Sequence, residues 1–210
     1  TRLACSHNGF NWHHPRGRPA WLELGVPGEP DSGFHVTANT WVDHGDDMYM
    51  YYYGAGPQHG FCIRPDFSID PTISLEEQRN MGRILLARQK RDRFASLGAP
   101  WKGVFEVENS TCIDRTSGRR HLEAGPRGGD TLFVNAVTRN AGSLRVAIFE
   151  NGRKEPLPGF ALEDCVPFRG DAVRGAIRYK KASVAQIPPE MGLYLQFEVR
   201  CGEVYGYEWG

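Results

Sequence analysis

The stretch Gly142–Tyr179 constrains the fold of this chain most, because it combines an alternating strand with closely spaced turn signals. Every second side chain of its first strand is a large aliphatic one: Leu144, Val146 and Ile148. This period of two predicts a half-buried β-strand. Asn151-Gly152 follows at once and readily supplies the positive φ angles of a tight hairpin turn. Short strands separated by Gly, Pro and Asn in this way predict an antiparallel β-sandwich.

The charge balance narrows the choice of partners. The 210 residues include 25 Lys and Arg and 25 Asp and Glu, so the formal net charge is zero. A nucleic-acid partner is not expected, because binding phosphates requires a basic surface. No membrane partner is expected either, because no apolar run approaches the roughly 18 residues that a spanning helix needs. The chain starts at Thr1 without an initiator Met, so we interpret it as a fragment or processed form whose location stays open, with secreted or periplasmic as one option.

The five cysteines give no metal or cofactor signal. Cys5, Cys62, Cys112, Cys165 and Cys201 are scattered and odd in number, and none belongs to a CxxC pair. A zinc site is therefore not expected, and no other cofactor is implied. A Cys165–Cys201 disulfide within the sandwich is one alternative, but buried free thiols are favoured.

The same stretch carries a family resemblance. GSLRV at residue 142, then PGFALEDC and a Gly-Asp pair at 170–171, resembles the C-terminal β-sandwich of bacterial glycoside-hydrolase-like proteins with a five-bladed propeller. These are invertase-like and arabinanase-like enzymes of the glycosyl hydrolase family 32/43 type. Residues 193–207 are similar to the closing strands of that module, and the resemblance covers most of residues 83–210.

The earlier part of the chain resembles the last propeller blade of these proteins. Asp31-Ser32-Gly33 and the run from Tyr52 to Gly60 carry this match. Residues 6–12 look like a propeller hairpin in which Gly9 takes a positive φ and Trp12 packs beneath the turn. Asn8 stands where the family has Asp.

The expected fold class is all-β: one antiparallel propeller blade remnant, followed by an antiparallel β-sandwich. Residues 1–98 form the blade region and residues 99–210 the accessory sandwich. Strands are expected at 33–42, 48–53 and 82–88, with a shorter one at 21–24, and then at 103–109, 131–138, 143–150, 173–179 and 193–201. A short helical turn after Ser74 and an Arg-rich loop at 115–121 complete the expected elements.

The candidate substrate-binding residues are Asp31, His35, Tyr53 and His59. They flank the ends of the expected blade strands, and the resemblance implies that such ends meet the ligand at the mouth of a propeller channel. A sugar site uses carboxylates and imidazoles to bind hydroxyls and aromatic rings to cover ring faces. Simpler roles compete with this one: Tyr53 can be ordinary cross-strand packing, Asp31 can cap a loop, and His59 can cap the loop that follows it.

No catalytic residue is assigned. Glu163-Asp164 looks like the carboxylate pair of a glycosidase, but adjacent strand residues point to opposite faces. We interpret the pair as holding a turn or an arginine such as Arg169 or Arg174. The resemblance implies that the catalytic carboxylates lie on earlier blades, which this sequence does not contain.

The sequence therefore predicts the C-terminal fragment of a glycoside hydrolase-like protein. It would hydrolyse glycosidic bonds only when the earlier blades are present, so the fragment alone is expected to be inactive. The expected partners are an oligosaccharide or glycan, and the missing blades or an oligomer partner at the open sheet edges. Two alternatives stay open: a non-catalytic, lectin-like carbohydrate-binding module, and a purely structural β-sandwich.

Overall fold

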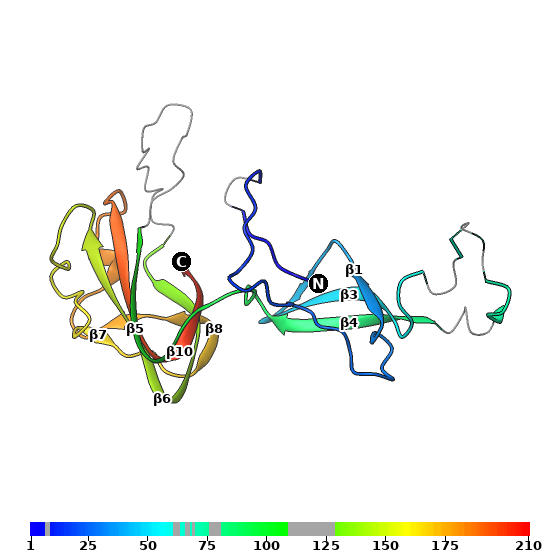
Figure 1. Cartoon of the computed structure of the whole chain (residues 1–210). Helices are drawn as coiled ribbons and strands as arrows, with labels where there is room; N and C mark the ends of the chain where they lie inside the picture. Colours follow the sequence, from blue (N-terminus) through cyan, green and yellow to red (C-terminus); the bar gives the residue numbers. More distant parts are fainter. Residues whose placement is uncertain (7–8, 61–63, 66–67, 69, 76–80, 109–128) are drawn as a thin grey trace. The chain divides into compact units, whose positions relative to one another are not determined.

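The protein is all-β, as predicted (Figure 1). The computed structural model describes residues 1–6, 9–60, 64–65, 68, 70–75, 81–108 and 129–210. Within these residues every paired strand is antiparallel, and the chain separates into two compact units, Thr1–Phe94 and Ala95–Gly210. The division falls a few residues before the expected boundary at residue 98.

The first unit is one sheet built around a central strand, β3 (Asp47–Ala55). β4 (Gly82–Lys90) pairs with its whole length on one side. On the other side β1 (Phe34–Thr37) and β2 (Val42–His44) lie one after the other. The single strand expected at 33–42 is thus broken in two, and the strand expected at 21–24 does not form.

One face of this sheet is covered by other side chains of the unit, and the other face is exposed. Met48 and Met50 are buried on one face. The rings of Trp21, Trp41 and Phe94 form a cluster on the same face. The Trp21 indole connects this cluster to the sheet, because it donates to the Gln89 side chain, which in turn contacts Met48. The opposite face, called the open face below, exposes six large apolar side chains: Val36, Val42, Tyr51, Tyr53, Ile84 and Leu86. The strand register puts them on one side, because Tyr53 pairs with both Val36 and Ile84, Tyr51 with Leu86, and Val42 with Tyr49.

The second unit contains a four-stranded sheet in the order β5-β10-β6-β8. Its strands are β5 (Leu97–Glu108), β6 (Leu132–Glu150), β8 (Asp171–Ala176) and β10 (Leu193–Trp209). A small sheet of β7 (Cys165–Val166) and β9 (Arg178–Tyr179) and a 3-10 turn, η1 (Val184–Gln186), complete it. All five strands expected after residue 98 lie within or overlap these elements.

A shared bend turns this sheet into a sandwich-like unit. The pairing of β10 with both of its neighbours is interrupted at Cys201. Opposite this one residue β6 has four residues, 139–142, and β5 has two, 100–101. Asn140, Ala141 and Cys201 have φ values of 49°, 61° and 45°, the left-handed region that L-residues seldom adopt. Extra residues of this kind bend a strand and increase its twist. The two halves of β6 and β10 therefore line one common core (Figure 1).

The core confirms the alternation predicted for the strand at residues 143–150. Leu144, Val146 and Ile148 are all fully buried. The phenol of Tyr179 donates to the carbonyl of Val146 at 2.9 Å, so the end of the stretch is fixed to its beginning. The Asn151-Gly152 turn forms and is closed by the Arg153 N–H, which donates to the Glu150 carbonyl at 3.0 Å. Of the two expected positive φ angles only that of Gly152, 81°, is present, because Asn151 is not among the residues of positive φ.

The cysteine expectation is only partly right. Cys5, Cys165 and Cys201 are free thiols, so the alternative of a Cys165–Cys201 disulfide is wrong. Cys165 is buried, but Cys201 is partly exposed at the bend and Cys5 is exposed. Cys62 and Cys112 lie outside the described residues, as do Asn8, most of the turn after Ser74, and the Arg-rich loop at 115–121.

The predicted hairpin at residues 6–12 forms with one difference. Gly9 has a φ of 73° and donates its N–H to the Ser6 hydroxyl at 2.8 Å. The Trp12 indole donates to the Gly9 carbonyl at 3.0 Å, yet the Trp12 side chain is 61% exposed. The expectation that Trp12 packs beneath the turn is therefore wrong, because the ring reaches the turn with its edge and leaves its face in solvent.

Gly142 is the residue on which the bend most depends. A Cβ atom at this position would collide with the carbonyl oxygens of Arg200, Cys201 and Arg139. We expect Gly142→Ala to lower the free energy of unfolding by about 1–3 kcal/mol or more, the cost of overpacking against a rigid backbone. Chemical denaturation of the full chain measures this.

Gly206→Ala is the matched control, because a Cβ atom there meets no atom within 4 Å. It should change stability by much less than Gly142→Ala. Equal stability of the two variants would mean that the bend does not need a glycine.

Candidate functional site

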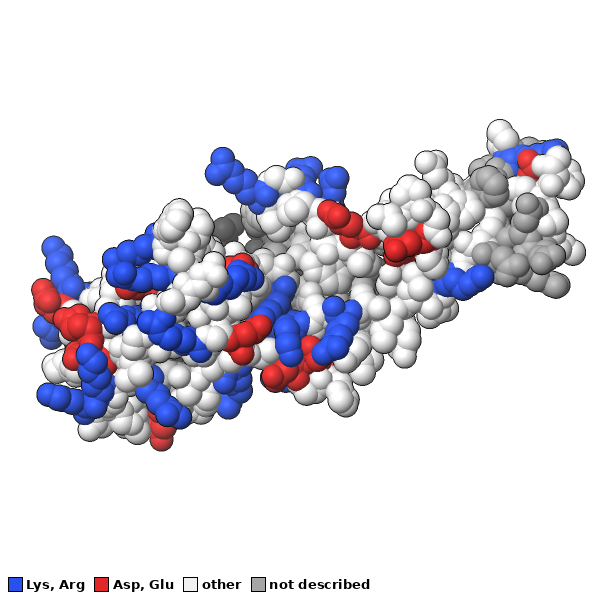
Figure 2. Space-filling view, turned by 90° about the horizontal axis from the view of Figure 1, so that it is seen from below, with Lys and Arg blue, Asp and Glu red and all other residues white. Residues whose placement is uncertain are grey.

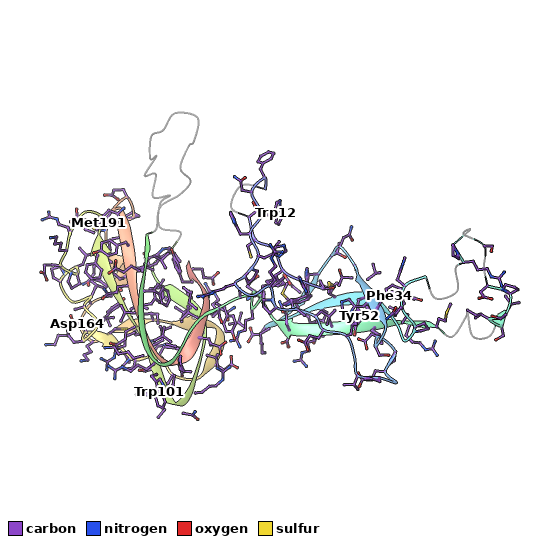
Figure 3. All side chains as sticks on the ribbon, in the orientation of Figure 1. Trp12, Phe34, Tyr52, Trp101, Asp164 and Met191 are labelled. Atoms are coloured by element: carbon purple, nitrogen blue, oxygen red, sulfur yellow. The ribbon has the colours of Figure 1, made fainter. Side chains whose placement is uncertain are left out.

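The first group of candidate residues lies where β1 and β3 meet (Figure 3). The Tyr52 hydroxyl donates to the Asp31 carboxylate at 2.7 Å, and only 8% of Asp31 is exposed. Gly54 makes this possible, because a Cβ atom there would lie 2.5 Å from the Cβ of Asp31. The hydrogen bond thus holds the segment just before β1 against β3. Because Asp31 is buried, little of its carboxylate is accessible to a ligand.

His35 lies on the same side of the sheet, since it pairs with Gly54. Its ring meets the Tyr52 ring edge to face at 6.0 Å, and its Nε2 lies 2.8 Å from the Thr1 hydroxyl. Its Nδ1 is buried and makes no hydrogen bond within the described structure. Burial lowers the pKa of His35, so the imidazole is neutral at pH 7.

The pKa of Tyr52 moves the other way. Burial of the phenol and then its hydrogen bond to the Asp31 carboxylate raise the pKa of Tyr52 to about 12. Both effects disfavour a phenolate, because it would be poorly solvated and would face a second negative charge. Tyr52 is therefore a fixed hydrogen-bond donor and not a proton-transfer group at neutral pH.

The second group gathers on the open face around Phe34. The Phe34 ring contacts the Tyr53 ring at 5.7 Å and the His59 ring at 5.2 Å. Tyr53 is 37% exposed and lies across Gly82, where a Cβ atom would collide with its ring. His59 is exposed, so both side chains can be reached from solvent.

The four predicted site residues are thus divided between the two faces of the sheet. Asp31 and His35 lie with Tyr52 on one face, and Tyr53 and His59 lie with Phe34 on the other. The strand pleat makes this unavoidable, because His35 and Phe34, like Tyr52 and Tyr53, are neighbours in sequence. A single pocket holding all four is not what the structure forms.

Glu163-Asp164 lies in a turn and not on a strand. The Asp164 carbonyl accepts from the Lys180 N–H at 2.9 Å, and the Glu163 carbonyl accepts from the Lys180 ammonium at 2.6 Å. The turn role is therefore right, but it is performed by the backbone. The suggested arginine partners are wrong: Arg169 donates to the carbonyls of residues 141 and 142, and Arg174 pairs with Glu208.

The sequence reasoning missed a groove on the second unit. It has a volume of about 390 Å³ and lies over the outward faces of β5, β10 and β6, beside residues 154–163. Eleven residues line it, among them Glu106, Phe149, Glu163, Tyr194 and Gln196. The outward alternation of Tyr194 and Gln196 on β10 was visible in the sequence, but their neighbours come from four separate segments.

Metal and membrane signals are lacking in the part of the chain that the structure describes. No group of three or more His, Cys, Asp or Glu side chains there is placed to hold a metal ion. None of the helices among those residues has the length and apolar character needed to cross a membrane. The chain matches no model of a known protein family, no curated protein and no solved structure.

The Tyr52–Asp31 hydrogen bond can be tested by Tyr52→Phe, which leaves the buried carboxylate without its donor. We expect the free energy of unfolding to fall by about 1–3 kcal/mol. Tyr51→Phe, at a side chain that is 57% exposed, should be nearly neutral in the same denaturation experiment. A neutral effect of Tyr52→Phe would contradict the fastening role.

The raised pKa of Tyr52 gives a pH dependence as well. Folding raises this pKa from 10.0 to about 12. The contribution of Tyr52 to stability is therefore complete below about pH 10 and is lost as the pH rises through about 12. Ultraviolet titration should show one phenol fewer ionising near pH 12 in Tyr52→Phe than in the unmodified chain.

Proposed function

We infer that this chain is the last blade and accessory sandwich of a glycoside hydrolase-like propeller protein, which acts on glycosidic bonds only together with its preceding blades. The observation that carries the proposal is the open face of the first unit. β1 with β2, then β3 and β4, form an antiparallel meander three strands wide, one strand short of the four-stranded sheet of a propeller blade, so the proposal places the fourth strand outside these elements. A free-standing sheet with six exposed large apolar side chains on one face is half of a packed pair.

The character of the open face supports a sheet as its cover. Its six large apolar side chains are aliphatic or tyrosyl, the types that interdigitate when two sheets pack about 10 Å apart, and the charged Asp47, Arg88 and Lys90 are confined to one end of the face. Figure 2 shows, on the side seen there, Lys, Arg, Asp and Glu side chains interspersed over the second unit. Neighbouring propeller blades cover one another in this way, face to face.

On this proposal Tyr53 and His59 are the sugar contacts of the blade. Both are exposed, and the two ring nitrogens of an imidazole can hydrogen-bond to sugar hydroxyls. Asp31 and His35, proposed at first as direct contacts, would act by fixing Tyr52 and the start of β1. The two catalytic carboxyls, held about 5–10 Å apart across the scissile bond, would come from the earlier blades.

Activity tests the proposal directly. The 210-residue chain should not hydrolyse aryl glycosides or oligosaccharides, whereas the longer protein with the residues encoded before Thr1 should. In that longer protein His59→Ala should weaken sugar binding or turnover by about 1–3 kcal/mol with little change in melting temperature. Hydrolysis by the 210-residue chain, or a gene that encodes no further blades before Thr1, would contradict the proposal.

The open face gives a second, independent test through Ile84→Thr/Leu86→Thr. In the 210-residue chain this double variant should reduce concentration-dependent self-association, measured by sedimentation velocity, and leave stability nearly unchanged. In the longer protein it should lower the free energy of unfolding by about 2 kcal/mol or more, because both side chains would be buried against the neighbouring sheet.

Val166→Thr, at an exposed side chain of the second unit, is the control and should have neither effect. An equally small effect of the double variant in both proteins would show that no sheet covers the open face.

Sugar binding without hydrolysis is the second candidate function. It is favoured by one observation, the groove of the second unit.

A further inference from the structure

The geometry points to a neutral-oligosaccharide site in the groove of the second unit, separate from any propeller channel. The inference rests on the proposed carbohydrate function only for the choice of ligand class. The groove itself is built entirely from residues 106–196 of this chain.

The floor of the groove is the outward face of the sheet. Tyr194 and Gln196 of β10 lie between Glu106 of β5 and Ala147 and Phe149 of β6, because Gln196 pairs with both Glu106 and Ala147. The small Ala147 side chain leaves the hollow. Crossing from β5 to β6 spans two strand spacings, or roughly 10 Å, which is room for more than a monosaccharide.

The wall beyond β6 is formed by residues 154–156 and 161–163. It is held against the strand by backbone hydrogen bonds, from the Leu157 N–H to the Ile148 carbonyl at 2.8 Å and from the Ile148 N–H to the Phe160 carbonyl at 3.1 Å. The groove is therefore a built feature of the fold, with a fixed floor and a fixed side.

The aromatic element of the floor is already oriented. The Tyr194 ring stacks on the Phe149 ring at 4.6 Å with 11° between the planes, and the Tyr194 hydroxyl donates to the Arg153 carbonyl at 2.9 Å. A ligand that contacts this ring has no rotamer to immobilise, which removes one entropic cost of binding. Phe149 is buried, so Tyr194 is the ring that the floor presents, and an aromatic ring in a polar groove suits the apolar C–H faces of sugar rings.

The polar element of the groove is rich in acceptors. Glu106 accepts from the Gln196 side chain at 2.9 Å, which orients the amide and leaves its carbonyl oxygen available. Glu155 and Glu163 make no side-chain hydrogen bond or ion pair within the described structure. Elsewhere on the same sheet face Glu198 is held by Lys102 at 2.7 Å and Arg200 at 3.0 Å, so unpaired carboxylates are not the rule here.

These groups select a neutral, hydroxyl-rich ligand. Sugar hydroxyls donate to carboxylates and amide carbonyls, and Lys154 can donate to a ring or hydroxyl oxygen. Three carboxylates against one ammonium disfavour uronic-acid or sulfated saccharides by like-charge repulsion.

Isothermal titration of the 210-residue chain with a panel of neutral oligosaccharides tests the site, with polygalacturonate fragments as the acidic comparison. The panel comprises xylo-, arabino-, fructo-, cello- and malto-oligosaccharides. At least one neutral member should bind, and the acidic fragments should not. Gln196→Ala and Glu163→Gln should each weaken that binding by about fivefold to tenfold, the loss of one hydrogen bond.

Glu190→Gln is the matched control, because Glu190 is an exposed carboxylate outside the groove. It should leave affinity unchanged, and thermal unfolding should show that all three variants are folded.

Each other outcome overturns the inference. Absence of binding by the whole panel, preference for the acidic saccharides, or binding that is insensitive to Gln196→Ala and Glu163→Gln would do so. These results are distinguishable from failure of the proposed function, because hydrolysis is measured on the longer protein and groove binding on the 210-residue chain.

Discussion

The antiparallel pairing of β6 with β10 is the interaction on which the second unit depends. It runs from Leu193 against Glu150 to Trp209 against Leu132 and is interrupted only at two register shifts. At the first of these the sheet bends, and the two halves supply opposite sides of one core. Because neighbouring strands bend at the same level, one connected sheet replaces the two separate sheets of an ordinary sandwich, and a glycine at 142 is needed where the backbones meet.

The same pairing also places the groove. Inward residues of β10 fill the core, so the outward residues Tyr194 and Gln196 are fixed in direction by the burial of Leu195 and Phe197 between and beside them. A slip of one residue in register would bury the groove residues and expose the core. The recognition surface and the stability of the unit are therefore two consequences of one register.

Unlike the second unit, the first unit leaves one face of its sheet exposed. Its covered face is closed by the rings of Trp21, Trp41 and Phe94 and by the Tyr52–Asp31 hydrogen bond, while its open face has no cover among the described residues. Burying a large apolar side chain is worth about 1.5–3 kcal/mol, so six exposed ones represent a considerable driving force for association. This imbalance, more than any single polar residue, is why we propose a neighbouring sheet.

The sequence by itself determined the all-β class, the strands around Tyr52 and Ile148, and the Asn151-Gly152 turn, because period-two alternation and Asn-Gly turns are local properties. It also nominated Asp31, His35, Tyr53 and His59 from their positions at strand ends. Only the tertiary structure divided them between two faces, because the register that pairs His35 with Gly54 decides which side chains of β1 and β3 share a face. Ala141 and Cys201 carry no local signal for a left-handed φ, so the bend is set by packing across three strands. The groove was equally hidden, because Glu106, Ala147, Glu163 and Gln196 become neighbours only when strands distant in sequence pair.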